Sequence, residues 1–309
     1  MNPTPRDWLL LFGLGVIWGA AFMATKLATL DFAPLTIAGL RLSIAAITLT
    51  TVMWLRGARF PGLATPHERK FWLAALAVGV LANVVPFATL SWAQRHIDSG
   101  LAAVLMTTMP LIILPLGHFF VPGEHITLRR LIGFLIGFAG VGVLIGPDAF
   151  LALGAGGTVA VLAQAGCVLA AFGYASGSII AKRAPQLGLL RFGAATLILA
   201  ALISMPLALA LESPFNGMPS PAGLAAVLYL GLVPTALATV MLLTVIGTAG
   251  PSFLSLVNYQ VPLWAVVFGV TFLGETPSPR LGIALVMMLL ALTVAQSRLG
   301  LRRGGHVKG

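Results

Sequence analysis

The sequence has 309 residues, of which 59% are hydrophobic and only 8% are charged. Soluble domains carry about a quarter charged residues, so this composition excludes a soluble globular protein. The net charge of +10 reflects a shortage of acids, with 8 Asp and Glu against 18 Lys and Arg. Because the bases lie between apolar runs rather than on one face, the charge indicates a membrane protein and not a nucleic-acid-binding one.

Ten apolar runs follow one another along the chain, each near the length of about 20 residues that a helix needs to cross a bilayer. They cover residues 8–30, 34–55, 71–93, 99–121, 129–147, 157–181, 187–211, 222–246, 250–273 and 280–298. Pro- and Gly-containing turns separate them, and no gap is long enough for a soluble domain. We therefore predict an all-α membrane protein with ten transmembrane helices.

The two halves share motifs at a spacing of 150 to 154 residues. The paired motifs are Trp18-Gly19 with Phe172-Gly173, Leu40-Arg41 with Leu190-Arg191, Gly79 and Asn83 with Gly231 and Thr235, Met109-Pro110 with Val261-Pro262, and Gly123-Glu124 with Gly274-Glu275. Each half has five spans, an odd number, so the second half enters the membrane upside down. Inverted repeats are typical of secondary transporters, which bind substrate near the midplane between the repeats.

These patterns predict a first five-helix repeat over residues 1–147, a linker over 148–156, a second five-helix repeat over 157–301 and a basic, disordered tail over 302–309. The orientation follows from the basic residues, of which fourteen lie on the side of the termini. They are Arg6, Arg56, Arg59, Arg69, Lys70, Arg129, Arg130, Lys182, Arg183, Arg191, Arg298, Arg302, Arg303 and Lys308. The positive-inside rule then places both termini in the cytoplasm and the protein in the inner (plasma) membrane.

One group of motifs resembles a known family. The first half carries Ile17-Trp18-Gly19-Ala20-Ala21-Phe22 with Lys26, then Pro34 and Arg41, then Gly100-Leu101-Ala102-Ala103-Val104-Leu105 with Pro110 and Gly123-Glu124. This pattern resembles the EamA-type unit of the drug/metabolite transporter superfamily, and the second half repeats it more loosely. The resemblance implies two inverted EamA units and export of small metabolites, often amino acids. Within the superfamily, the chain looks most like the YddG-type amino-acid exporters.

Motifs for catalysis or for nucleotide binding are missing from the sequence. It contains no His-Glu-x-x-His, no Walker-type glycine loop and no Gly-x-Ser-x-Gly, and its five histidines lack metal-ligand spacing. We therefore expect a transporter and not an enzyme, with no metal and no other cofactor. Transport would run on gradients or on exchange.

Polar and aromatic residues at mid-span are the candidate substrate-binding residues, because hydrocarbon does not satisfy polar groups. They are Trp18, Asn83, Phe87, Met106, Thr107, Thr235, Thr239, Asn258 and Tyr259. In the ninth span, Ser255, Asn258, Tyr259 and Pro262 are expected to share one helix face. The alternative is hydrogen bonding between helices, which is favoured for each Thr or Ser alone. For Asn83 and Asn258 both interpretations stay open.

A second set of residues is expected to act as hinges or structural elements. Pro86, Pro110, Pro234 and Pro262 remove backbone donors deep in the membrane and are expected to break their helices. Lys26 is expected to extend towards the membrane surface, and Arg41 to pair with Asp31 or Asp98 or to cap a helix. A direct role of Arg41 in binding a carboxylate is the alternative.

Two acids of the same set occupy matching positions in the two repeats. Glu124 and Glu275 each precede a helix, where capping is expected and proton coupling is the alternative.

Together these features predict an exporter of small organic solutes, foremost amino acids and including aromatic ones. The alternatives are a drug or sugar-phosphate carrier of the same fold and a passive channel. A membrane-embedded enzyme is disfavoured by the missing catalytic residues. The expected partners are a small-molecule substrate and lipid, without nucleic acid, and the oligomeric state is left open.

Overall fold

The computed structural model describes residues 3–120, 126–145, 158–212 and 217–296. Every regular element in these ranges is a helix, which confirms the predicted all-α membrane fold. Glu124, the whole predicted linker 148–156 and the tail 302–309 lie outside the described residues.

The first repeat forms five helical spans. They are α1 (Pro5–Ala28); α2 (Pro34–Leu55); α3 (Pro66–Gly79) continued by the π-helix η1 (Val80–Val84) and α4 (Val85–Ala93); α5 (Ser99–Met106) followed by α6 (Met109–Phe120); and α7 (Leu128–Ile145). Proline occupies the first turn of α1, α2 and α3, where its missing N–H removes no helical hydrogen bond.

The second repeat gives five corresponding spans. They are α9 (Thr158–Arg183); α10 (Leu189–Leu211); α11 (Pro221–Gly231) continued by the π-helix η2 (Leu232–Leu237) and α12 (Ala238–Ala249); α13 (Pro251–Leu254) followed by α14 (Val257–Leu273); and α15 (Pro279–Gln296). Of the described helical segments, seven are long and apolar enough to cross a membrane. The three other spans contain shorter apolar helices, at Leu131–Leu144, Val257–Leu273 and Pro279–Val294.

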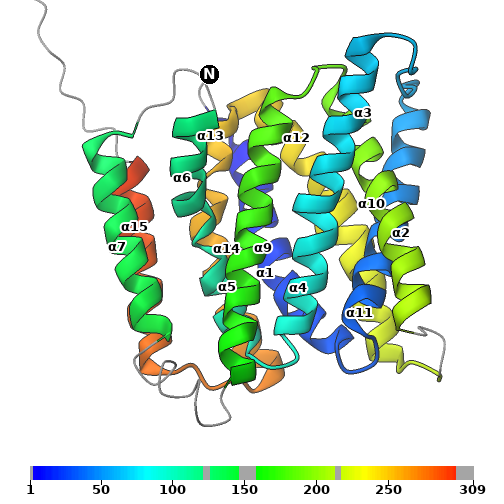
Figure 1. Cartoon of the computed structure of the whole chain (residues 1–309). Helices are drawn as coiled ribbons and strands as arrows, with labels where there is room; N and C mark the ends of the chain where they lie inside the picture. The colour runs from blue at the N-terminus through cyan, green and yellow to red at the C-terminus, as the bar shows by residue number, and fades with distance from the viewer. Residues whose placement is uncertain (1–2, 121–125, 146–157, 213–216, 297–309) are drawn as a thin grey trace, which may run out of the picture.

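The packing of the helices follows the inverted repeat. Helix α2 packs on its counterpart α10, and α7 packs on its counterpart α15 (Figure 1). Helix α1 packs on α14 and α11, while its counterpart α9 packs on α6 and α4. These particular contacts therefore recur when every span is replaced by the span five places away, as an approximate two-fold relation requires.

These contacts divide the centre of the molecule into two helix groups. The α1 group comprises α1, α11, η2, α12, α13 and α14, and the α9 group comprises α9, α3, η1, α4, α5 and α6. Each group contains spans from both repeats. The pairs α2–α10 and α7–α15 flank the groups on opposite sides of the bundle (Figure 1).

We call the end of the bundle at which α1 begins the proximal end, and the opposite one the distal end. Helix α5, which begins at the distal end, packs across the two groups on α1 and α14. Its counterpart at the proximal end, α13, packs chiefly on α12, within its own group. The two groups are therefore closely packed at the distal end, and the approximate symmetry is broken at the proximal end.

Candidate functional site

The two π-helical turns lie at equivalent places in the third and eighth spans. Turn η1 directly follows Gly79, and η2 directly follows Gly231. These glycines allow close approach of a neighbouring helix. A Cβ at Gly79 would lie 3.0 Å from the carbonyl oxygen of Thr196, and one at Gly231 would lie 2.6 Å from Cβ of Ile44. π-helical turns inside α-helices are frequently found at functional sites.

Each π-helical turn carries one polar side chain that binds a backbone carbonyl five residues earlier. Asn83 Nδ2 donates to the oxygen of Val78 at 3.2 Å, and Thr235 Oγ1 donates to the oxygen of Leu230 at 2.7 Å. Residue 234 is a proline, so the Leu230 carbonyl lacks the amide donor that an α-helix would supply. The Thr235 hydroxyl replaces that donor.

Trp18 reaches the same turn from α1. Its Nε1 donates to the carbonyl oxygen of Pro234 at 3.1 Å. One turn before η2, the Tyr229 hydroxyl donates to the carbonyl oxygen of Ile17 at 3.3 Å. Sequence reasoning did not single out Tyr229. These two bonds fix α1 against the irregular part of the eighth span.

Arg41 approaches η2 from α2. Its side chain is only 9% exposed, and its Nε donates to Thr235 Oγ1 at 2.7 Å. The guanidinium lies over the Phe87 ring, with Cζ 3.7 Å from the ring centroid, a favourable cation–π geometry. Arg41 thus contacts Thr235 of the α1 group and Phe87 of the α9 group.

The expected pairing of Arg41 with an acid is wrong within the described residues. Asp31 accepts instead from the backbone nitrogen of Ser220 at 2.9 Å and from its hydroxyl at 2.6 Å. Asp98 lies at the distal end near Lys26 and Glu275, which influence its charge.

Five residues therefore form what we call the central cluster: Trp18, Arg41, Phe87, Tyr174 and Thr235. Tyr174 joins it through its ring, whose centroid is 6.3 Å from that of Phe87. The cluster draws on five spans and on both helix groups. It combines one cation, hydroxyl groups and aromatic surfaces.

The remaining candidate binding residues are distributed more widely. Thr239 donates to the Thr235 carbonyl, next to the central cluster, whereas Met106 packs in an apolar core with Tyr174. Thr107 contacts Met288 of α15, and the Tyr259 hydroxyl bonds with Thr293 of the same helix. The structure therefore does not join Thr107 and Tyr259 to the central cluster.

The ninth span differs from expectation at its break. The chain leaves the helix at Ser255 and Leu256, and α14 then continues through Pro262 without interruption. Ser255 and Asn258 therefore do not lie on one continuous helix, and the break predicted at Pro262 is wrong. Pro262 is the sixth residue of α14, so its missing N–H leaves the Asn258 carbonyl without its usual helical donor, yet the helix continues past it.

The other three prolines lie at irregular points of their spans. Pro86 is the second residue of α4, just after η1, Pro234 lies within η2, and Pro110 is the second residue of α6, just after the gap between α5 and α6. Backbone irregularity thus occurs at the three sites where the sequence predicted it, although a hinge motion at these sites stays a prediction.

Charged side chains connect the two helix groups at the distal end. Lys26 Nζ donates to the carbonyl oxygens of Gln94 at 2.6 Å and Ile97 at 2.9 Å, so it caps the end of α4 rather than extending freely to the surface. Arg95 Nη2 donates to the carbonyl oxygen of Phe32, in the loop after α1, at 2.9 Å.

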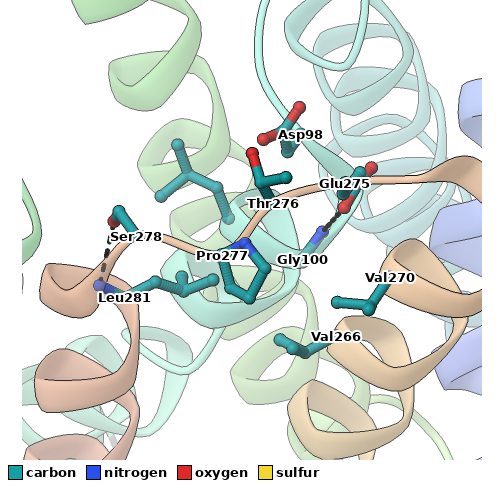
Figure 2. Close-up of a pocket in the computed structure, with 10 residues that line it drawn as sticks. Asp98, Gly100, Val266, Val270, Glu275, Thr276, Pro277, Ser278 and Leu281 are labelled. Carbon is teal, nitrogen blue, oxygen red and sulfur yellow. Dashed lines mark hydrogen bonds between the residues drawn. The ribbon is translucent and has the colours of Figure 1, made fainter.

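Glu275 makes the third distal connection. Its carboxylate accepts from the backbone nitrogen of Ser99 at 2.6 Å and from that of Gly100 at 3.1 Å (Figure 2). Glu275 therefore caps α5 of the other repeat and not, as expected, the helix that follows it. A carboxylate at a helix N-terminus is stabilised by the helix dipole and by the free N–H groups.

Two cavities open beside these distal contacts. One of about 90 Å³ is lined partly by Asp98, Glu275 and Thr276 (Figure 2), and one of about 350 Å³ is lined partly by Lys26, Asp98 and Leu273. Burial raises the pKa of the Asp98 carboxyl, the nearby Glu275 carboxylate raises it further, and Lys26 acts in the opposite direction. These small cavities belong to the contact region between the groups.

Comparison with known proteins agrees with this architecture. The profile of the EamA-like transporter family matches residues 7–146 and 161–295. The uncharacterized inner membrane transporter YedA of Escherichia coli (strain K12) is 29% identical over 287 residues, which cover 92% of this chain and 88% of YedA. A probable terminal-alkyne amino-acid exporter of Streptantibioticus cattleyicolor is 28% identical over 320 residues, which cover 96% of this chain and 97% of the relative.

A protein of known crystal structure also shares the fold. It aligns with a TM-score of 0.66 at 20% sequence identity, covering 94% of this chain and 97% of the other. At this identity the likeness establishes the fold alone. The family profile, in contrast, matches a segment in each half of the sequence. The chain therefore belongs to the EamA-like transporter family.

Proposed function

We propose that the protein is a secondary transporter that exports amino acids, including aromatic ones, across the inner membrane by alternating access. Two relatives of similar length support this proposal, one named an inner membrane transporter and the other a probable amino-acid exporter. The inverted repeat supports the mechanism, because such repeats bind substrate at their interface and expose it to each side in turn.

The observation that carries the proposal is the pair of π-helical turns at equivalent positions in the two repeats. Each turn holds a polar side chain, Asn83 in η1 and Thr235 in η2, and Trp18 bonds to the second turn at Pro234. Irregular backbone in a membrane is tolerated where it is buried in protein or lines a polar cavity. Two such turns, one in each helix group, support a binding site between the groups.

The broken symmetry supports alternating access. At the distal end Lys26, Arg95 and Glu275 bind backbone atoms across the groups, and α5 packs on α1 and α14. At the proximal end, α13 packs chiefly within its own group. We interpret this arrangement as a state closed at the distal end. The alternate state would exchange these roles, with the distal contacts broken.

The orientation of the protein in the membrane determines the direction of transport. The excess of basic residues at the proximal end supports a cytoplasmic location for that end and for both termini. A state closed at the distal end would then accept substrate from the cytoplasm, as an exporter requires.

The central cluster supports the substrate class. Its aromatic rings offer an apolar surface for a side chain, and its hydroxyl groups and single cation offer polar contacts. One cation among these residues is a poor match for a substrate with several negative charges, which disfavours a sugar phosphate.

The test is counterflow in proteoliposomes that contain the purified protein. Vesicles preloaded with an unlabelled amino acid should accumulate the same labelled amino acid above its external concentration. The measurement uses a panel of amino acids, with and without a proton gradient. Flux of these amino acids without counterflow would indicate a passive channel, and counterflow of sugar phosphates but no amino acid would refute the substrate class.

A further inference from the structure

We propose that Arg41 binds the carboxylate of the substrate. This inference deepens the proposed function and rests on it. Arg41 would then be a substrate-binding residue rather than a structural one. The substrates would be compounds that carry one carboxylate next to an apolar group.

The first support is the environment of the charge. Arg41 is 91% buried, and no acid among the described residues forms an ion pair with it. A buried guanidinium without a counter-ion is unfavourable, so a carboxylate that reaches it gains strongly from the pairing.

The second support is the geometry of the guanidinium. Thr235 accepts from Nε, and the Phe87 ring covers one face of the plane. These contacts leave the two terminal Nη groups, which together carry four N–H donors, without a hydrogen-bond partner among the described residues. A guanidinium held in this way is oriented in advance to bind a carboxylate with two parallel hydrogen bonds.

The third support is the position of Arg41 between the helix groups. Thr235 belongs to the α1 group and Phe87 to the α9 group, so the guanidinium lies where the two groups meet. Tyr174 packs next to Phe87, and Trp18 bonds to Pro234, so both contribute aromatic surface to the same cluster. A carboxylate bound here would contact the interface that has to rearrange during transport.

The repeat supplies a matched control. Arg191 occupies the position in α10 that corresponds to Arg41 in α2. Its Nη1 donates to the carbonyl oxygen of Leu187, four residues earlier, near the proximal end. Substituting Arg191 with a neutral residue therefore removes the same charge as substituting Arg41, but at a position outside the central cluster.

The experiment compares three ligands that differ only in their charged groups: L-phenylalanine, 3-phenylpropionate and phenethylamine. Binding of each is measured on purified wild type, Arg41→Gln, Arg41→Lys and Arg191→Gln, together with the melting temperature. Wild type should prefer the two carboxylates to the amine. Arg41→Gln should bind the carboxylates about ten- to a hundredfold more weakly and the amine unchanged, because the lost bonds involve a charged group. Arg191→Gln should behave as wild type.

Arg41→Lys keeps the charge but loses the planar fork, so its affinity for carboxylates should be intermediate. Folded Arg41→Gln protein with wild-type affinity for both carboxylates would overturn the inference, as would an equal loss for all three ligands. If Arg41→Gln does not fold, the comparison of carboxylates with the amine in wild type decides, and equal affinities refute a carboxylate anchor. Absence of amino-acid counterflow in wild type is a separate result, and it refutes the proposed function instead.

Discussion

Asn83 and Thr235 occupy the same place in the two inverted repeats and make the same bond. Each donates from its side chain to the carbonyl oxygen five residues earlier, Asn83 to Val78 and Thr235 to Leu230. Thr235 in addition accepts a hydrogen bond from Arg41. The two turns therefore have the same backbone arrangement but different side-chain partners. Among the residues that the structure describes, only the π-helical turn of the second repeat bonds to a cation.

The first prediction concerns the hydroxyl of Thr235. Thr235→Val removes the donor to Leu230 and the acceptor for Arg41, leaving two buried polar groups unsatisfied. Each such group costs about 1–3 kcal/mol, so thermal unfolding should occur at a clearly lower temperature. Thr235→Ser keeps the hydroxyl and should remain close to wild type. Equal melting temperatures for the Val and Ser variants would show that these bonds do not stabilise the fold.

The second prediction separates Asn83 from Asn258. Asn83 bonds Val78, so Asn83→Ala should lower the melting temperature. The Asn258 side chain makes no hydrogen bond with the described residues, so Asn258→Ala should leave thermal stability unchanged. If Asn258 contacts substrate, the same variant should bind it about tenfold more weakly. A stable Asn258→Ala variant with unchanged affinity would remove this residue from the site.

The third prediction concerns the cap at the distal end. Glu275→Gln keeps one oxygen acceptor but loses the charge that two backbone N–H groups of α5 now bind. We expect a loss of about 1–2 kcal/mol in unfolding free energy, in the range of helix-cap substitutions. Chemical or thermal unfolding in detergent gives the measurement. Wild-type stability would show that the cap is dispensable.

The fourth prediction concerns Asp98, which lies near Glu275 at the distal end but, unlike Glu275, caps no helix with its side chain. Burial and the Glu275 carboxylate raise the pKa of Asp98 above its ordinary value of 3.8, so the folded protein binds this proton more tightly than the unfolded chain does. Stability from this group is therefore lost as pH rises above that value. Asp98 makes no side-chain cap bond, so Asp98→Asn should raise stability near neutral pH. The gain should shrink as pH falls towards 3.8, and a gain independent of pH would contradict this account.

The fifth prediction is topology. Single cysteines at Arg59, at the proximal end, and Met218, at the distal end, are both exposed, and the native Cys167 is buried. A membrane-impermeant maleimide should label Met218→Cys in intact cells and Arg59→Cys only after permeabilisation. The reverse pattern would invert the orientation and would make the proposed direction of transport wrong.

Sequence reasoning predicted the ten spans and the inverted repeat, because long apolar runs and repeated motifs are local signals. It also selected Trp18, Phe87 and Thr235, which the structure brings together. The signal was a polar or aromatic residue at mid-span, and Phe87 and Thr235 in addition each follow a proline. The family profile agrees with the resemblance seen in the motifs.

The hydrogen-bond partners of these residues could not be predicted from the sequence, because they depend on which helices pack against each other. Arg41 contacts Thr235, 194 residues away, and Glu275 caps Ser99, 176 residues away. The break lies at Ser255 and Leu256 rather than at Pro262, and the periodicity of the sequence does not encode this position. Sequence reasoning did not select Tyr229, because a single tyrosine at mid-span cannot be distinguished by sequence from a residue that only fills the core.

We propose that the two helix groups open alternately around the central cluster. The most direct measurement is the distance between spin labels placed on the two groups in a Cys167→Ala background. One pair of labels is placed at the distal end, at Leu30 and His96, and the other at the proximal end, at Arg183 and Gly247. All four positions are exposed, and a side chain at Gly247 would meet no atom within 4 Å. Without substrate, the distal pair should show a short distance. Adding a transported amino acid should lengthen a fraction of the distal distances and shorten a fraction of the proximal ones. Distances that lengthen together at both ends, or that stay fixed while counterflow proceeds, would contradict alternating access.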